Sequence, residues 1–223
     1  MLPLAPRLYS TYVGKKYAMA VSGIVLMLYV LTHMIGNLKL YSGAADLDTY
    51  ATWLRTVGEP ELPRTALLWT LRVVLIAAFA IHIHSAYALT RANRKARPVQ
   101  YASRREYAAA DFASRTMRWT GVIVGLFVIF HLLDLTWGPA NPDFHHGDPY
   151  HNVIESFQRV PVALVYVVAN VALAIHLYHG AWSLTQSMGW VFPYRRHLAI
   201  LYACVIGVGN VSFPLAVMTG IVG

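Results

Sequence analysis

Cysteine and charge are both scarce in this sequence. Only one of its 223 residues is a cysteine, Cys204, which excludes a disulfide framework and a metal site built from clustered cysteines. Charged residues make up 13% of the chain, against about 25% in an average soluble domain. The sequence also lacks a glycine-rich phosphate loop, Gly-x-Ser-x-Gly, His-Glu-x-x-His and Cys-x-x-Cys-His. These absences exclude disorder and argue against an ordinary soluble enzyme.

Apolar residues are abundant instead, at 57% of the chain, with a mean hydropathy of +0.47. A membrane-spanning helix needs about 20 predominantly apolar residues. Five stretches meet this requirement, at about 17–40, 65–89, 117–137, 161–188 and 198–222. We therefore expect an all-α integral membrane bundle of five transmembrane helices that forms one domain over residues 1–223.

The positive charges lie on one side of these spans. With the N-terminus in the cytoplasm, the inner face carries a net charge of +11 and the outer face −3. The inner face holds Arg7, Lys15, Lys16, Arg91, Arg94, Lys95, Arg97, Arg104, Arg105, Glu106, Asp111, Arg115, Arg118, Arg195 and Arg196. Cytoplasmic loops are enriched in Lys and Arg, so the pattern predicts an N-in, C-out topology. Acidic lipid headgroups or a soluble protein partner fit this basic face, and nucleic acid is not needed to explain it.

Histidines are unusually frequent inside the spans. Six of the ten lie there, namely His33, His82, His84, His131, His176 and His179. Ionisable side chains in a bilayer core are costly and usually functional. Interhelical hydrogen bonding explains a single such histidine, but it is a weak explanation for histidines on four helices at matching depths.

The depths predict two pairs. At about 1.5 Å of rise per residue, His33 and His131 lie about 9–10 Å from the outer edge, on the first and third spans. On the second and fourth spans, His84 and His176 lie about 23–29 Å from that edge. Two imidazoles that face each other in a dry four-helix core are the arrangement that bis-histidine ligation of a haem b iron needs. We therefore expect an outer haem at His33 and His131 and an inner haem at His84 and His176.

A weak internal echo accompanies the histidines. Ser22-Gly23 and Thr120-Gly121 each stand ten residues, counted from the glycine, before the outer histidine of their span. This spacing places Gly23 and Gly121 near the inner level, where a porphyrin needs close backbone approach. Gly180, four residues after His176, lies on the same helix face. Helix–helix packing is the alternative role for all three glycines.

The pattern alone does not decide the role of several histidines. His82 and His84 are about 200° apart around a helix, so only one can face the iron. His176 and His179 share a face, so either can ligate, and His179 can instead contact a propionate or a quinone. The outer segment that contains His145, His146 and His151 can bind a metal ion, although a solvated loop is the commoner meaning of such a sequence.

Four segments together resemble a known family. They are "VLTHMIGN", "HIHSAYAL", "RWTGVIVGLFVIFHLLDL" and "IHLYHGAWSL", and they resemble the cytochrome b membrane subunit of succinate dehydrogenases. The resemblance is to the single-chain, five-helix, two-haem branch that some fumarate reductases share, and it covers nearly the whole chain.

The resemblance implies ligands and a mechanism. It selects His84 over His82 and His176 over His179 for the inner haem. A flavoprotein subunit and an iron–sulfur subunit would dock on the cytoplasmic face, and electrons would pass through the haems to a quinone, in this branch usually menaquinone. Glu59 and Glu61 are then candidates for the quinone site or its proton path. We expect a multi-pass subunit of succinate:quinone oxidoreductase in a prokaryotic cytoplasmic membrane.

One departure and three alternatives accompany this interpretation. Some two-haem fumarate reductases carry a proton-conducting glutamate two residues before the ligand of the fourth span, where this chain has Ala174. The alternatives are a two-haem subunit of a fumarate reductase, hydrogenase or formate dehydrogenase, a non-redox anchor or transporter, and a complex with one haem or a non-haem iron centre.

Overall fold

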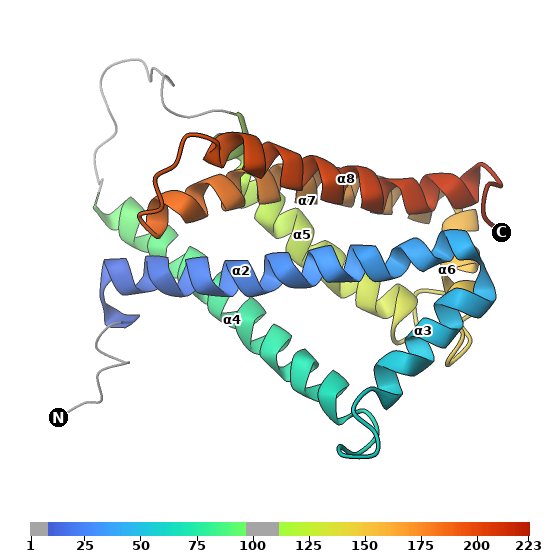
Figure 1. The fold of residues 1–223 in the computed structure, drawn as a ribbon. Helices are drawn as coiled ribbons and strands as arrows, with labels where there is room; N and C mark the ends of the chain where they lie inside the picture. Colours follow the sequence, from blue (N-terminus) through green and yellow to red (C-terminus); the bar gives the residue numbers. More distant parts are fainter. Residues whose placement is uncertain (1–8, 97–111) are drawn as a thin grey trace.

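The computed structural model describes residues 9–96 and 112–223, and within them it is helical (Figure 1). In chain order the elements are α2 (Tyr12–Asn37), the short 3₁₀ helix η1 (Leu38–Ser42), α3 (Ala44–Thr56), α4 (Ala66–Lys95), α5 (Phe112–Leu135), α6 (Pro149–Gln158), α7 (Val160–Ser187) and α8 (Arg195–Met218). Five of these helices, namely α2 together with η1, α4, α5 from Arg115, α7 and α8, are long and apolar enough to cross a membrane. The expected all-α fold with five spans is confirmed.

The helix boundaries follow local chemistry that the apolar runs did not reveal. Thr11 caps α2, because its side chain accepts a hydrogen bond from the amide of Gly14 at 2.9 Å. The helix therefore begins five residues before the expected start of the first apolar stretch at residue 17. At the other end of the chain, α8 stops at Met218, four residues before the expected end at 222.

Two short helices between the spans were not expected. Gly43 has a φ of 97° and turns the chain from η1 into α3. Asp148 and Pro149 begin α6, where the Asp148 carboxylate accepts a hydrogen bond from the amide of His151. Figure 1 shows α3 and α6 at the end of the bundle that also holds the C-terminus, and the two helices contact each other there.

Most of the basic residues gather at the opposite end of the bundle. Of the fourteen Lys and Arg residues in the described part of the chain, nine lie at the start of α2, the end of α4, and the starts of α5 and α8. The other five lie toward the end that holds α3 and α6, and they are Lys39, Arg55, Arg64, Arg72 and Arg159. A hydrogen bond of 2.9 Å from the Tyr12 hydroxyl to the Asn93 side chain joins the start of α2 to the end of α4. Arg7, Arg97, Arg104, Arg105, Glu106 and Asp111 lie outside the described residues. The separation of charge along the bundle agrees with the topology that the sequence predicts.

Small residues let α7 and α8 pack closely. Ala163, Ala203 and Ile206 are buried in this part of the core. A Cβ atom added at Gly207 would lie only 2.9 Å from the Cβ of Ala174. Position 174 therefore faces α8 at close range, and the structure holds no space there for the glutamate of some fumarate reductases.

The outward surfaces of the spans are apolar. Ile76 is 67% exposed, Leu126 64% and Val208 72%. A soluble monomer rarely exposes contiguous apolar surface on this scale, whereas a spanning helix presents such surface to lipid. The helices therefore bury only part of their apolar surface against one another, and lipid would cover the rest.

Candidate functional site

The inner pair joins α4 to α7. The ring centres of His82 and His176 are 6.4 Å apart, and the planes of the rings are inclined by 68°. His84, which the sequence resemblance favours, is exposed, and its ring stacks on Tyr9 with a centre-to-centre distance of 5.7 Å. Its Nδ1 also lies within hydrogen-bond distance of the Tyr9 hydroxyl. The structure thus places His82, and not His84, opposite His176.

Matching hydrogen bonds orient the two inner rings. Nδ1 of His82 lies 3.2 Å from the carbonyl oxygen of Met19 and 3.4 Å from the hydroxyl of Ser22, both on α2. The Ser22 hydroxyl itself donates to the carbonyl of Ala18 at 2.7 Å. Nδ1–H of His82 is therefore the donor toward α2, and its Nε2 keeps a lone pair.

His176 repeats this arrangement on the other helix pair. Its Nδ1 lies 3.4 Å from the hydroxyl of Thr120, and it also hydrogen-bonds the backbone of Met117, both on α5. The Thr120 hydroxyl donates to the Met117 carbonyl at 3.0 Å. The first helix of each pair, α2 and α5, therefore carries the pattern Met-x-x-Ser/Thr-Gly, and this pattern orients a histidine on the next spanning helix, α4 or α7. The weak internal echo of the sequence has a structural counterpart.

Two glycines leave room for these rings. A Cβ atom at Gly23 would lie 3.5 Å from Cε1 of His82, and one at Gly121 would lie 3.3 Å from Cε1 of His176. The second distance is shorter than ordinary van der Waals contact, so any side chain at Gly121 would press on the ring. Gly180 differs, because its added Cβ would meet only the tip of Met117, at 3.9 Å. The expected inner level of Gly23 and Gly121 is thus observed, and Gly180 shows no comparable need for glycine.

The outer pair joins α2 to α5. The ring centres of His33 and His131 are 5.9 Å apart, and the rings are nearly perpendicular at 86°. Tyr29 stacks on His33 from within α2, with ring centres 5.3 Å apart. On the other side, the Tyr166 hydroxyl lies 3.4 Å from Nδ1 of His131. Together with the inner pair, the contacts connect the first span to the third and the second to the fourth, as the depths predict.

A buried carboxylate supports the outer pair. Asp134 is fully buried, and it accepts hydrogen bonds from the hydroxyls of Ser156 and Tyr166, the latter at 2.8 Å. Arg159 forms an ion pair with it at 2.7 Å. Since the Tyr166 hydroxyl donates to Asp134, it accepts from Nδ1–H of His131 and leaves Nε2 of that ring free.

Sequence reasoning missed this network, although one signal was present. Asp134 is an acidic residue three positions after His131 in an apolar span, and buried charges in such places are paired. Its partner Arg159 lies 25 residues further along the chain, and nothing in the sequence links the two.

The remaining candidates do not take part in the two facing pairs. His179 contacts Trp182 edge-to-face with ring centres 6.1 Å apart. Glu59 and Glu61 are exposed in the turn between α3 and α4. His84 points away from the inner pair toward Tyr9, so the doubled histidines of the second and fourth spans do not converge on one site as a non-haem iron centre would need.

Both pairs fit the axial coordination of a haem iron. A metal–imidazole bond of about 2.0–2.1 Å puts the centres of two rings on opposite sides of one ion about 6 Å apart. The observed separations are 6.4 and 5.9 Å. The assigned hydrogen bonds of His82, His176 and His131 use Nδ1 and go to neighbouring helices rather than across the pair. The residues that are present therefore suit two bis-histidine sites.

Comparison with known proteins yields one match. The family model described as "Succinate dehydrogenase/Fumarate reductase transmembrane subunit" matches residues 90–215, more than half of the chain. The matched part contains His131, Asp134 and His176, whereas His33 and His82 precede it. No curated protein and no solved structure matches the chain.

Proposed function

The chain belongs to the family of succinate dehydrogenase/fumarate reductase transmembrane subunits, and we propose that it carries electrons between the soluble subunits of such a complex and a membrane quinone. Two haem b groups would serve this transfer, one between His82 and His176 and one between His33 and His131. The observation that carries the proposal is the close approach of two histidine pairs from four different spans.

The ligands of the inner site differ from the assignment that the sequence resemblance favours. His82 replaces His84, because the ring of His82 lies opposite His176 and is oriented by α2. His82 and His176 would hold a haem here, which would supply reversible one-electron chemistry. The chain's own residues hold the imidazoles in the ligating tautomer through Nδ1, and the apolar helices exclude water.

The charge distribution supports the proposed docking side. The basic helix ends gather at one end of the bundle, and the inner pair lies close to that end: Thr120, which bonds His176, is two residues from Arg118 in α5. An iron–sulfur subunit at this face would meet the inner site first. A flavoprotein subunit bound to the iron–sulfur subunit would complete the complex.

Quinone chemistry is proposed at the opposite end of the bundle. The outer pair lies between Tyr29 on one side and the network of Tyr166 and Asp134 on the other. Quinone reduction takes up two protons as well as two electrons. Glu59 and Glu61, exposed at this end, can exchange protons with the outer solution, and menaquinone is the proposed substrate. We propose succinate oxidation as the physiological direction.

The test separates electron relay from the dehydrogenase reaction itself. In the assembled complex, His176→Ala should abolish the inner haem and sharply reduce succinate-to-quinone transfer, while succinate oxidation with a soluble dye persists. His146→Ala, at an exposed loop position, is the matched control and should change neither activity. Equal loss of both activities in an assembled complex, or full quinone reduction without the inner haem, would contradict the proposal.

A further inference from the structure

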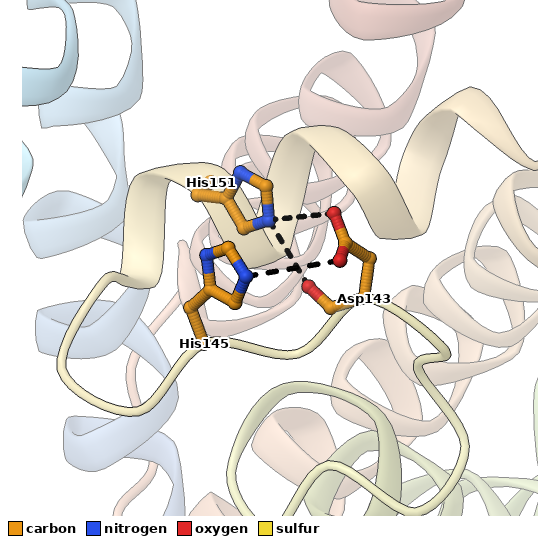
Figure 2. A group of neighbouring side chains, drawn as sticks. All are labelled: Asp143, His145 and His151. Carbon is orange, nitrogen blue, oxygen red and sulfur yellow. Dashed lines mark hydrogen bonds and ion pairs between the residues drawn. The ribbon is translucent and has the colours of Figure 1, made fainter.

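Three potential metal ligands meet where the segment after α5 leads into the first turn of α6. Nε2 of His151 lies 3.2 Å from the carboxylate of Asp143, and Nε2 of His145 lies 3.7 Å from the same carboxylate. One ligand atom from each of the three residues lies within 4.8 Å of the others. Figure 2 shows both rings directing a nitrogen toward Asp143. The sequence left a metal site and a solvated loop both open here. The structure brings the three side chains together, with those of His145 and Asp143 still 59% and 60% exposed.

The rings are arranged for a shared ligand. His145 and His151 stack with ring centres 4.2 Å apart and planes inclined by only 6°. In a tetrahedral zinc site the bonds from the ion to its ligand atoms are about 2.0–2.1 Å long, so two neighbouring ligand atoms lie about 3.3 Å apart. The two nitrogen–carboxylate separations bracket this value. Small side-chain rotations would therefore bring all three atoms to bonding distance.

Buried amides hold the backbone of this segment. The side chain of Asn152, which is 3% exposed, accepts from the His145 amide and donates to the His145 carbonyl, both at 2.7 Å. The Asn141 side chain, 4% exposed, donates to the backbone carbonyl of Asn152 at 3.1 Å. Asp148 accepts from the amide of His151 as it caps α6. The backbones of His145 and His151 are therefore fixed to the folded core before any ion binds.

The donor set indicates the class of ion. Two imidazoles and one carboxylate, with a coordination position left for water, suit Zn²⁺ and its neighbours among the divalent transition metals. Mg²⁺ and Ca²⁺ prefer sites made of oxygen alone. In the metal-free state, Nε2 of His151 donates to the Asp143 carbonyl at 3.0 Å, and a bound ion would displace that proton.

We propose that Asp143, His145 and His151 form a site for a divalent transition metal at the end of the bundle that holds the C-terminus. A bound ion ties the segment after α5 to the first turn of α6. The last turns of α6 carry Ser156, which bonds Asp134 beside the outer histidine pair. Metal binding therefore stabilises the end of the bundle on which the support of that pair depends.

The test uses the complete complex with an affinity tag that contains no histidine. After treatment with a chelator, Zn²⁺ is added in competition with a fluorescent zinc indicator. The wild type should bind one more Zn²⁺ per chain than His145→Ala or His151→Ala does. If those variants still bind the ion, their affinity should be at least about tenfold lower, because even the loss of a residue that only supports a metal ligand lowers affinity by about that factor. His146→Ala should bind as the wild type does, and excess Mg²⁺ should not displace the zinc.

Asp143→Asn provides a second variant that preserves the size of the side chain and the backbone hydrogen bond of His151. It should weaken zinc binding while leaving haem content and the metal-free unfolding temperature unchanged. Zn²⁺ should raise the unfolding temperature of the wild type but not of His151→Ala. Equal zinc binding by the wild type and all three variants, equal loss in His146→Ala, or one ion per two chains would overturn the proposal. None of these results depends on whether the proposed electron transfer is correct.

Discussion

Replacing His82 by alanine should remove one of the two proposed haems, whereas replacing His84 should remove neither. Only one residue separates the two on α4. The two variants therefore change the same helix at nearly the same depth in the membrane. His82 faces His176 across 6.4 Å, and His84 faces Tyr9 on the exposed side of the helix. Only the first substitution deletes a nitrogen from a facing pair.

The expected size of each effect follows from these contacts. His82→Ala deletes half of the inner ligand set and the hydrogen bonds to Met19 and Ser22, so haem should fall from two per chain to one. His84→Ala deletes an exposed hydrogen bond to Tyr9. A typical hydrogen bond contributes about 0.5–1.5 kcal/mol to stability, and solvent competition reduces this contribution further. The haem content of the second variant should therefore remain at two.

Haem per chain is measured by extraction and absorbance against protein concentration, on complexes that retain dye-linked succinate oxidation. Reduced-minus-oxidised spectra would identify which haem is lost. If His84→Ala lost a haem and His82→Ala retained two, the orientation of α4 described here would be wrong. The assignment from the sequence resemblance would then be correct.

Two further substitutions test the surroundings of the pairs. Gly121→Val should reduce inner haem content, because its Cβ alone would lie 3.3 Å from Cε1 of His176 and overpacking costs about 1–3 kcal/mol. Gly125→Val is the control and should retain both haems, because its Cβ would meet nothing within 4 Å. Asp134→Asn should destabilise the protein by about 1.5–3 kcal/mol, the usual contribution of a hydrogen bond to a charged group, because it removes the ion pair with Arg159, whose side chain is 30% exposed. A thermal melt of the purified complex that matched the wild type would contradict this.

The sequence predicted the membrane spans and the pairing of the histidine-bearing helices. Both follow from lengths that are counted along the chain. Apolar length identifies a spanning helix, and rise per residue places His33 level with His131. Neither quantity depends on the rotation of a helix about its axis. The expected connections between the first and third spans, and between the second and fourth, therefore agree with the observed contacts.

The choice between His82 and His84 depends on that rotation. Two positions separated by about 200° are equivalent in depth, and the packing of α4 against Met19 and Ser22 of α2 decides between them. The matching Met-x-x-Ser/Thr-Gly segments were visible in the sequence as a partial echo. Only the three-dimensional arrangement shows that they orient a histidine of the next spanning helix.

The short helices α3 and α6 were missed for a different reason. They are too short and too polar to register as spans, and local capping by Gly43 and Asp148 determines where they begin. The ion pair of Asp134 with Arg159 joins α5 to the junction of α6 and α7. Sequence spacing carries no information about such a contact, because the loop between its partners sets their distance.

Haem quantified per chain in the purified wild-type complex tests the central claim most directly. The two histidine pairs predict two haem b groups per chain, both six-coordinate and low-spin, with an absorbance spectrum that changes on reduction by succinate. A colourless preparation of the intact complex would contradict the account, and so would a haem whose iron has fewer than two histidine ligands.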